Sequence, residues 1–106
     1  MIRIRYLLDE DTPHAIRDQL IRLQPDMEIL AVGDEKAPPF GTLDDELLRW
    51  VEKEGYILVS RNRRTMPKHL HRHLEAGGHV PGIFLLRSRY SVGEVIEDLL
   101  LIWENN

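Results

Sequence analysis

The stretch LLDEDTP at residues 7–13 organises the interpretation of this chain. Two leucines are followed by three acids and then by Thr12 and Pro13, so an apolar segment changes abruptly into a charged one. We expect residues 2–8 to form a buried strand. We expect a helix to begin at Pro13, because a fixed φ and a missing N–H suit proline to the first helical turn. The acids then occupy a strand-to-helix junction, and in an open α/β sheet ligands bind at the edge where such junctions lie.

The carboxylates of Asp9, Glu10 and Asp11 have two interpretations. Carboxylates held together repel one another unless a cation or hydrogen-bond donors stabilise them, and oxygen ligands of this kind suit Mg²⁺ or Mn²⁺. Alternatively, Asp11 caps the following helix by accepting its free N–H groups, while Glu10 faces water. Residues 7–13 alone leave both interpretations open, so the rest of the chain has to decide between them.

Composition limits the class of protein. The chain has 106 residues and no obvious linker, so we expect a single domain spanning residues 1–106. No apolar stretch approaches the ~20 residues of a membrane span, and the start does not follow a signal-peptide pattern. We therefore expect a cytoplasmic protein without membrane contact. The absence of cysteine excludes disulfides, thiol catalysis and zinc–thiolate sites. A formal net charge of −4 argues against non-specific coating of nucleic acid but leaves room for a local basic patch.

Apolar periodicity predicts strands and helices in strict alternation. Thr42 with Asp45, and Ser91 with Glu94, stand in the capping-box relation at two helix starts. Gly55 suits the left-handed position that ends a helix. The predicted strands cover residues 2–8, 27–32, 56–59 and 82–86, and the predicted helices cover residues 13–23, 42–54, 66–75 and 92–103.

This alternation predicts an α/β fold with a four-stranded, mainly parallel sheet. Parallel strands need crossover connections, which are right-handed and place helices on both faces of the sheet. The carboxyl ends of the strands, near residues 9, 32, 60 and 87, should then line one edge. We expect any chemistry to lie along that edge.

Asp44, Asp45 and Glu46 stand where the second helix begins. Acids in a first turn complement the helix dipole and need no other role. Alternatively, one of them turns toward Asp9 and completes a metal site, since a helix start can face the same edge as the strand ends.

The turn after the third strand, SRNRR at residues 60–64, carries groups that suit phosphate. The guanidinium groups of Arg61, Arg63 and Arg64 favour bidentate phosphate contacts. Ser60 and Asn62 can hydrogen-bond a ligand, a water or a carboxylate. The alternative is a solvated turn whose arginines pair with nearby acids.

Two further pairs of residues have structural interpretations. His69 and His73 are four apart on the third helix and could hold a transition metal, but no third ligand is evident, so we interpret them as solvated. Trp50 and Trp103 fall within apolar stripes, and we expect them to pack in the core. An apolar helix face with these tryptophans could support a homo-oligomer, although nothing in the sequence requires one.

Three stretches together resemble the short PIN-like domain proteins, a bacterial family often regarded as toxin components of toxin–antitoxin pairs. Residues 7–13 are similar to the family's opening LLDENLP, residues 44–48 to its helix start DEEIL, and residues 57–63 to VLVTNDKDF at the end of its third strand. The resemblance spans nearly the whole chain. It implies a small PIN-like three-layer sandwich, a Mg²⁺- or Mn²⁺-dependent ribonuclease activity, RNA as substrate and a small antitoxin-like partner protein.

The resemblance also implies roles for individual residues. Asp9 and Asp44 would be the metal ligands and, with Asn62, the catalytic set. Metal-assisted hydrolysis of a phosphodiester would follow, in which a cation activates water and stabilises charge on the phosphate. The secondary acidic candidates are Glu10, Asp11 and Asp45, and the candidates for binding phosphate or RNA are Ser60, Arg61, Arg63 and Arg64.

The chain departs from the family at the third strand. The family supplies aspartates there, whereas this chain has Asn62 and Arg64. Asn62 can ligate through its carbonyl oxygen or position a water but brings no charge, and Arg64 cannot be a ligand. Fewer carboxylates should weaken Mg²⁺ binding, so we expect a weakened ribonuclease. The alternative is a catalytically inactive interaction protein on the same fold.

A phospho-acceptor domain of the receiver type is a further alternative. Such a domain also has acids after its first strand, but it needs an aspartate after the third strand and a lysine after a later one. This chain offers Asn62 and Arg87 at those places. Because function has to be argued from the site, the missing acceptor disfavours this alternative.

Overall fold

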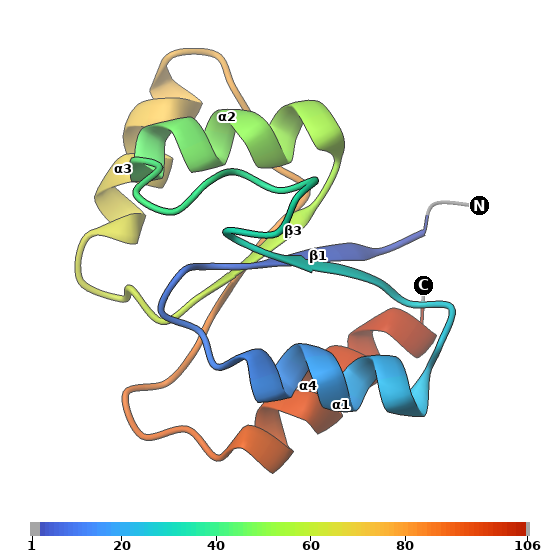
Figure 1. The fold of residues 1–106 in the computed structure, drawn as a ribbon. Helices are drawn as coiled ribbons and strands as arrows, with labels where there is room; N and C mark the ends of the chain where they lie inside the picture. Colours follow the sequence, from blue (N-terminus) through green and yellow to red (C-terminus); the bar gives the residue numbers. More distant parts are fainter. Residues whose placement is uncertain (1–2, 106) are drawn as a thin grey trace.

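The computed structural model describes residues 3–105, in which one sheet lies between two layers of helices (Figure 1). The strands form a single sheet in the order β2-β1-β3-β4, and every neighbouring pair is parallel. This confirms the predicted α/β class, the parallel sheet and the helices on both of its faces. In chain order the elements are β1 (Arg5–Leu8), α1 (His14–Leu23), β2 (Glu28–Ala31), α2 (Asp44–Glu54), β3 (Ile57–Ser60), α3 (Met66–Glu75), β4 (Ile83–Leu85) and α4 (Val92–Glu104).

Each face of the sheet has its own apolar core, and strand β1 contributes to both. Tyr6 and Leu8 belong to the core under α1 and α4, whereas Leu7 belongs to the core under α2 and α3. All three are fully buried, as expected for a central strand of a parallel sheet covered on both sides. Figure 1 shows the same division, with α2 and α3 on one side of the sheet and α1 and α4 on the other.

The predicted strand over residues 2–8 is shorter in the structure, because β1 begins at Arg5 and the described residues Arg3 and Ile4 are not in a strand; Ile2 lies outside the described residues. The helix-end signals are confirmed at two places. Gly55 follows α2 with φ +78°, and the Ser91 hydroxyl accepts a hydrogen bond from the Glu94 backbone N–H at the start of α4. Local sequence therefore sets these boundaries through glycine's freedom at positive φ and a serine cap.

The predicted capping box of Thr42 and Asp45 is wrong. The Thr42 hydroxyl donates to the Pro39 carbonyl oxygen at 2.7 Å, so it is engaged within the preceding loop. Leu43 occupies the position before α2 without a side-chain cap, and α2 begins at Asp44. Because Leu43 holds the capping position, Thr42 stands one residue too early to cap α2, and the spacing of Thr42 and Asp45 in the sequence does not reveal this shift.

Several apolar residues differ in burial from their predicted stripes. Trp50 and Trp103 pack against the two cores as predicted, each partly buried. Leu23, Leu43 and Leu74 are exposed instead. Within residues 3–105, no helix combines the length and the apolar character that crossing a membrane would require.

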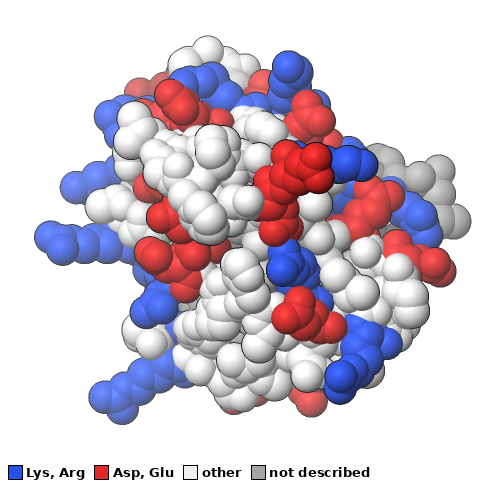
Figure 2. Space-filling view, in the orientation of Figure 1, with Lys and Arg blue, Asp and Glu red and all other residues white. Residues whose placement is uncertain are grey.

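Several basic side chains project from the carboxyl edge of the sheet. Figure 2 shows several Lys and Arg side chains projecting at the left of the view, where Figure 1 places the loops that follow β1 and β3. This is the carboxyl edge of the parallel sheet. The predicted location of the chemistry therefore coincides with a local basic border on a chain of net negative charge.

Candidate functional site

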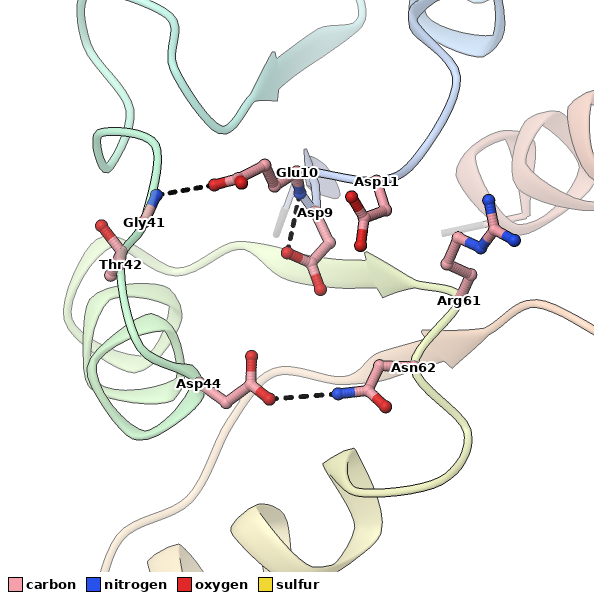
Figure 3. Close-up of a pocket in the computed structure, with 8 residues that line it drawn as sticks. All are labelled: Asp9, Glu10, Asp11, Gly41, Thr42, Asp44, Arg61 and Asn62. Carbon is pink, nitrogen blue, oxygen red and sulfur yellow. Dashed lines mark hydrogen bonds between the residues drawn. The ribbon is translucent and has the colours of Figure 1, made fainter.

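A cavity of about 350 Å³ opens at the carboxyl edge of the sheet (Figure 3). It brings together Asp9 after β1, Asp44 at the start of α2 and Asn62 after β3. Strands β1 and β3 are hydrogen-bonded neighbours, so their ends meet at this place. The residues that line the cavity are Asp9, Glu10, Asp11, Gly41, Thr42, Asp44, Arg61 and Asn62.

Asp9 is held by donors on both carboxylate oxygens. Its Oδ2 accepts from the Ser60 hydroxyl at 2.8 Å, and its Oδ1 accepts from the Glu10 backbone N–H at 2.7 Å. Burial raises the pKa of Asp9, the two donors lower it, and the carboxylates of Asp44 and Asp11 raise it again. The effect of Asp44 on this pKa means that the two acids interact across the cavity. A cation between them would favour the ionised form of Asp9.

Asn62 connects the cavity to the start of α3. Its amide nitrogen donates to Asp44 Oδ2 at 3.1 Å and to the Thr65 hydroxyl at 2.6 Å. Its side-chain oxygen accepts from the Thr65 backbone N–H at 3.2 Å, and its own backbone N–H donates to Ser60 Oγ at 3.0 Å. In this arrangement Asn62 presents a hydrogen-bond donor to Asp44. Its carbonyl oxygen, the atom that could ligate a cation, is turned to Thr65.

Asp45 lies apart from the cavity, although it neighbours Asp44 in sequence. Its Oδ1 lies 2.7 Å from Nδ1 of His69 on α3, and this hydrogen bond is the main cause that lowers the pKa of Asp45. Nε2 of the same histidine lies 3.6 Å from Asp44 Oδ2. His69 therefore ties both aspartates of α2 to α3, a role that residue spacing did not indicate.

The two histidines considered as metal ligands have different acidic neighbours. His73 Nε2 lies 2.7 Å from Glu52 Oε1, whereas His69 contacts Asp44 and Asp45. The pair therefore serves to join α3 to α2 through two separate contacts.

The four residues predicted to bind phosphate take different positions. Arg61 lines the cavity, whereas Ser60 is fully buried beneath Asp9. Arg63 donates to the carbonyl oxygens of Leu85 and Leu86 at 3.3 and 3.4 Å, which links the β3–α3 turn to the end of β4. The remaining residue, Arg64, is exposed.

The other acids of residues 7–13 also have distinct environments. Glu10 Oε1 accepts from the Gly41 backbone N–H at 2.7 Å and thereby joins the β1–α1 junction to the loop before α2. Asp11 lines the cavity, and the position before α1 is Pro13, without a side-chain cap. The alternative in which Asp11 caps α1 is therefore wrong, because the chain turns Asp11 into the cavity wall.

Asp9 and Asp44 suit a Mg²⁺ or Mn²⁺ ion that takes only some of its ligands from the protein. Across residues 3–105, no three His, Asp or Glu side chains are grouped as a ready-made metal site. Mg²⁺, however, usually keeps several waters and binds through one or two carboxylates plus substrate phosphates. Asp9 and Asp44 would supply the two carboxylates, and Arg61 at the same cavity would hold the substrate phosphate.

Comparison with known proteins adds no assignment. No protein-family model matches the sequence, and searches of curated proteins and of solved structures find no match. The function therefore has to be argued from the cavity and its residues.

Proposed function

We propose that this protein is a PIN-like, Mg²⁺- or Mn²⁺-dependent ribonuclease of weakened activity, acting in the cytoplasm as the toxin component of a toxin–antitoxin pair. The observation that supports the proposal best is the convergence of Asp9 and Asp44 on one cavity at the carboxyl edge of the sheet. The two acids come from different segments of the chain, and a role in helix capping or solvation would not require them to face each other.

Five residues in or beneath the cavity have definite tasks in this proposal. Asp9 and Asp44 hold the ion, and the ion when bound supplies charge stabilisation at the phosphate. Ser60 fixes the orientation of Asp9 through its 2.8 Å hydrogen bond. Arg61 is placed to contact a phosphate oxygen from the cavity wall. Asn62 orients Asp44 through its amide N–H.

The weakened activity follows from the low negative charge of the site. Asn62 donates to an oxygen of Asp44 and adds no negative charge of its own. The affinity of a hard cation depends on the number of charged ligands, so an aspartate at position 62 should bind the ion more tightly. Exchanging the amide for a carboxylate is therefore the most direct way to strengthen the site.

The test is cleavage of unstructured RNA in Mn²⁺ by the wild type, Asp9→Ala and Asn62→Asp. We expect weak cleavage by the wild type, none by Asp9→Ala and faster cleavage by Asn62→Asp. Asp26→Ala, an exposed acid in the turn between α1 and β2, is the matched control and should cleave like the wild type. Equal cleavage by the wild type and Asp9→Ala would refute the proposal.

One observation favours a second candidate, a catalytically inactive interaction protein. Within residues 3–105 the cavity lacks a third charged ligand grouped with Asp9 and Asp44. In that case the task of the protein would be binding a small antitoxin-like protein or a second copy of this chain. Calorimetric titration with Mn²⁺ separates the candidates, because absence of cation binding together with absence of cleavage in all variants supports the interaction protein.

A further inference from the structure

An exposed aromatic ring stands beside the acidic cavity. Phe40 is 65% exposed and directly precedes Gly41 and Thr42, which line the cavity wall. Figure 2 shows uncharged surface where Figure 1 draws this loop, with acidic side chains next to it. Phe40 therefore offers an exposed aromatic surface at the border of the cavity.

The ring is seated on the backbone of Gly33. A Cβ added to Gly33 would lie 2.3 Å from Cζ of Phe40 and 2.6 and 2.7 Å from its two Cε atoms. The similar distances to both Cε atoms, only slightly longer than the distance to Cζ, place that position over the face of the ring and not beyond its tip. Gly33 has φ +98°, a conformation that favours glycine. One face of the ring thus rests on a residue without a side chain.

The loop that carries the ring is fixed at both sides. The Gly33 backbone N–H donates to the Pro38 carbonyl oxygen at 2.8 Å. The Gly41 backbone N–H donates to Glu10 Oε1 at 2.7 Å. These bonds anchor Phe40 between the end of β2 and the acids that follow β1. The open ring face therefore has a defined position relative to the cavity.

We propose that Phe40 stacks on an unpaired base of the RNA strand whose phosphate occupies the cavity. This inference rests on the proposed function, and it adds a residue that positions the substrate and selects single strands. Every base has a π-face, so stacking on an aromatic side chain is tolerant of sequence. Bases inside a duplex already stack on each other and leave no face for the ring.

The surroundings favour a base over a partner protein as the occupant. The exposed apolar side chains of this loop are those of Pro39, Phe40 and Leu43, and the acidic cavity begins directly after Phe40. A stable protein interface buries roughly 800 Å² on each partner, far more than these three side chains offer. A base attached to a phosphate at Arg61 needs only the ring.

The test measures RNA binding in the Asp9→Asn background, so that cleavage does not consume the probe. The probe is a short unstructured RNA carrying a fluorophore, and anisotropy reports its affinity. Adding Phe40→Ala should weaken binding by about 5- to 100-fold. Phe40→Trp should keep the affinity, and its added fluorescence should be quenched when the base stacks. Leu101→Ala removes a similarly exposed apolar side chain on α4 and should bind like the background protein.

A duplex RNA of the same length is the specificity control, and its binding should not depend on position 40. The inference is overturned if Phe40→Ala binds the single strand as the background does, if single strand and duplex lose affinity equally, or if no variant binds RNA. If the wild type cleaves RNA and Phe40→Ala does not change the affinity for the single strand, the proposed function stands and the inference is removed. If binding of the single strand depends on Phe40 but no protein cleaves RNA, stacking by Phe40 stands and the proposed ribonuclease activity is removed.

Discussion

Ser60→Ala tests whether buried hydrogen bonds beneath the cavity hold its acids in place. Ser60 is fully buried, and its hydroxyl both donates to Asp9 Oδ2 at 2.8 Å and accepts from the Asn62 backbone N–H at 3.0 Å. The substitution removes both bonds at once. It leaves a carboxylate oxygen without its side-chain donor and a backbone N–H without its acceptor.

The magnitude follows from the two bonds. A hydrogen bond to a charged group contributes about 1.5–3 kcal/mol and one between neutral groups about 0.5–1.5 kcal/mol. Because Asp9 is only partly buried, we take the lower part of the summed range and expect a loss of about 2–3 kcal/mol in the free energy of unfolding. Such a loss is a large part of the ~5–15 kcal/mol that stabilises a typical domain.

The loss should also depend on pH with a defined sign. Burial raises the pKa of Asp9, and the Ser60 hydroxyl lowers it, so the variant should have a still higher native pKa at Asp9. When the pKa of an acid is higher in the native state than in the unfolded state, the protein loses stability as pH rises from the unfolded-state pKa to the native-state pKa. The unfolded-state pKa is the same in both proteins. The deficit of the variant should therefore be smallest below the raised native pKa of Asp9 in the wild type, and it should grow to a plateau between that pKa and the higher native pKa of the variant.

Urea denaturation of both proteins across this pH range measures the deficit. Ser88→Ala, an exposed serine between β4 and α4, is the control and should change stability by less than about 0.5 kcal/mol. A deficit for Ser60→Ala below about 1 kcal/mol, or one that stays constant with pH, would refute the reasoning.

Two further predictions concern the packing of helices. Tyr6→Phe removes the buried hydrogen bond from the Tyr6 hydroxyl to the Leu99 carbonyl oxygen at 2.7 Å and should cost about 1–2 kcal/mol in thermal or urea unfolding. Burial raises the pKa of Tyr6 to about 12, so this cost should not vary around neutral pH, and a neutral substitution would contradict the assignment. Glu52→Gln should remove pH-dependent stability, because the His79 backbone N–H and the His73 side chain lower the pKa of Glu52. That stability is present above the ordinary glutamate pKa of about 4.3 and is lost as pH falls through the lower native value, so the gap to the wild type should close in acid. A gap that is equal at neutral and acidic pH would contradict this explanation.

The sequence alone predicted the architecture because its signals are local. The alternation of apolar strands and amphipathic helices determined the order of elements, and parallel pairing followed because each connection is a helix. The acids after β1 were placed at the carboxyl edge for the same reason. Gly55 and Ser91 marked helix ends by their own backbone and hydroxyl chemistry.

Part of the cavity could also be predicted in this way. Asp9 and Asn62 follow neighbouring strands and meet at one edge once the strands are parallel. Asp44 reaches the same edge because α2 begins there. Phe40, Gly41 and Thr42 were missed as parts of the site or its border, since the prolines and glycines around them predict only a loop.

Tertiary structure decided which of two adjacent acids serves the cavity. Asp44 and Asp45 have the same charge and the same place in a first turn, yet they point about 100° apart around the helix axis. His69 comes from α3 and holds Asp45, while Asp44 faces Asn62 and the cavity. A periodic pattern in the sequence gives the spacing of side chains along a helix. The rotation of that helix against its neighbours depends on packing between segments that lie far apart in the chain.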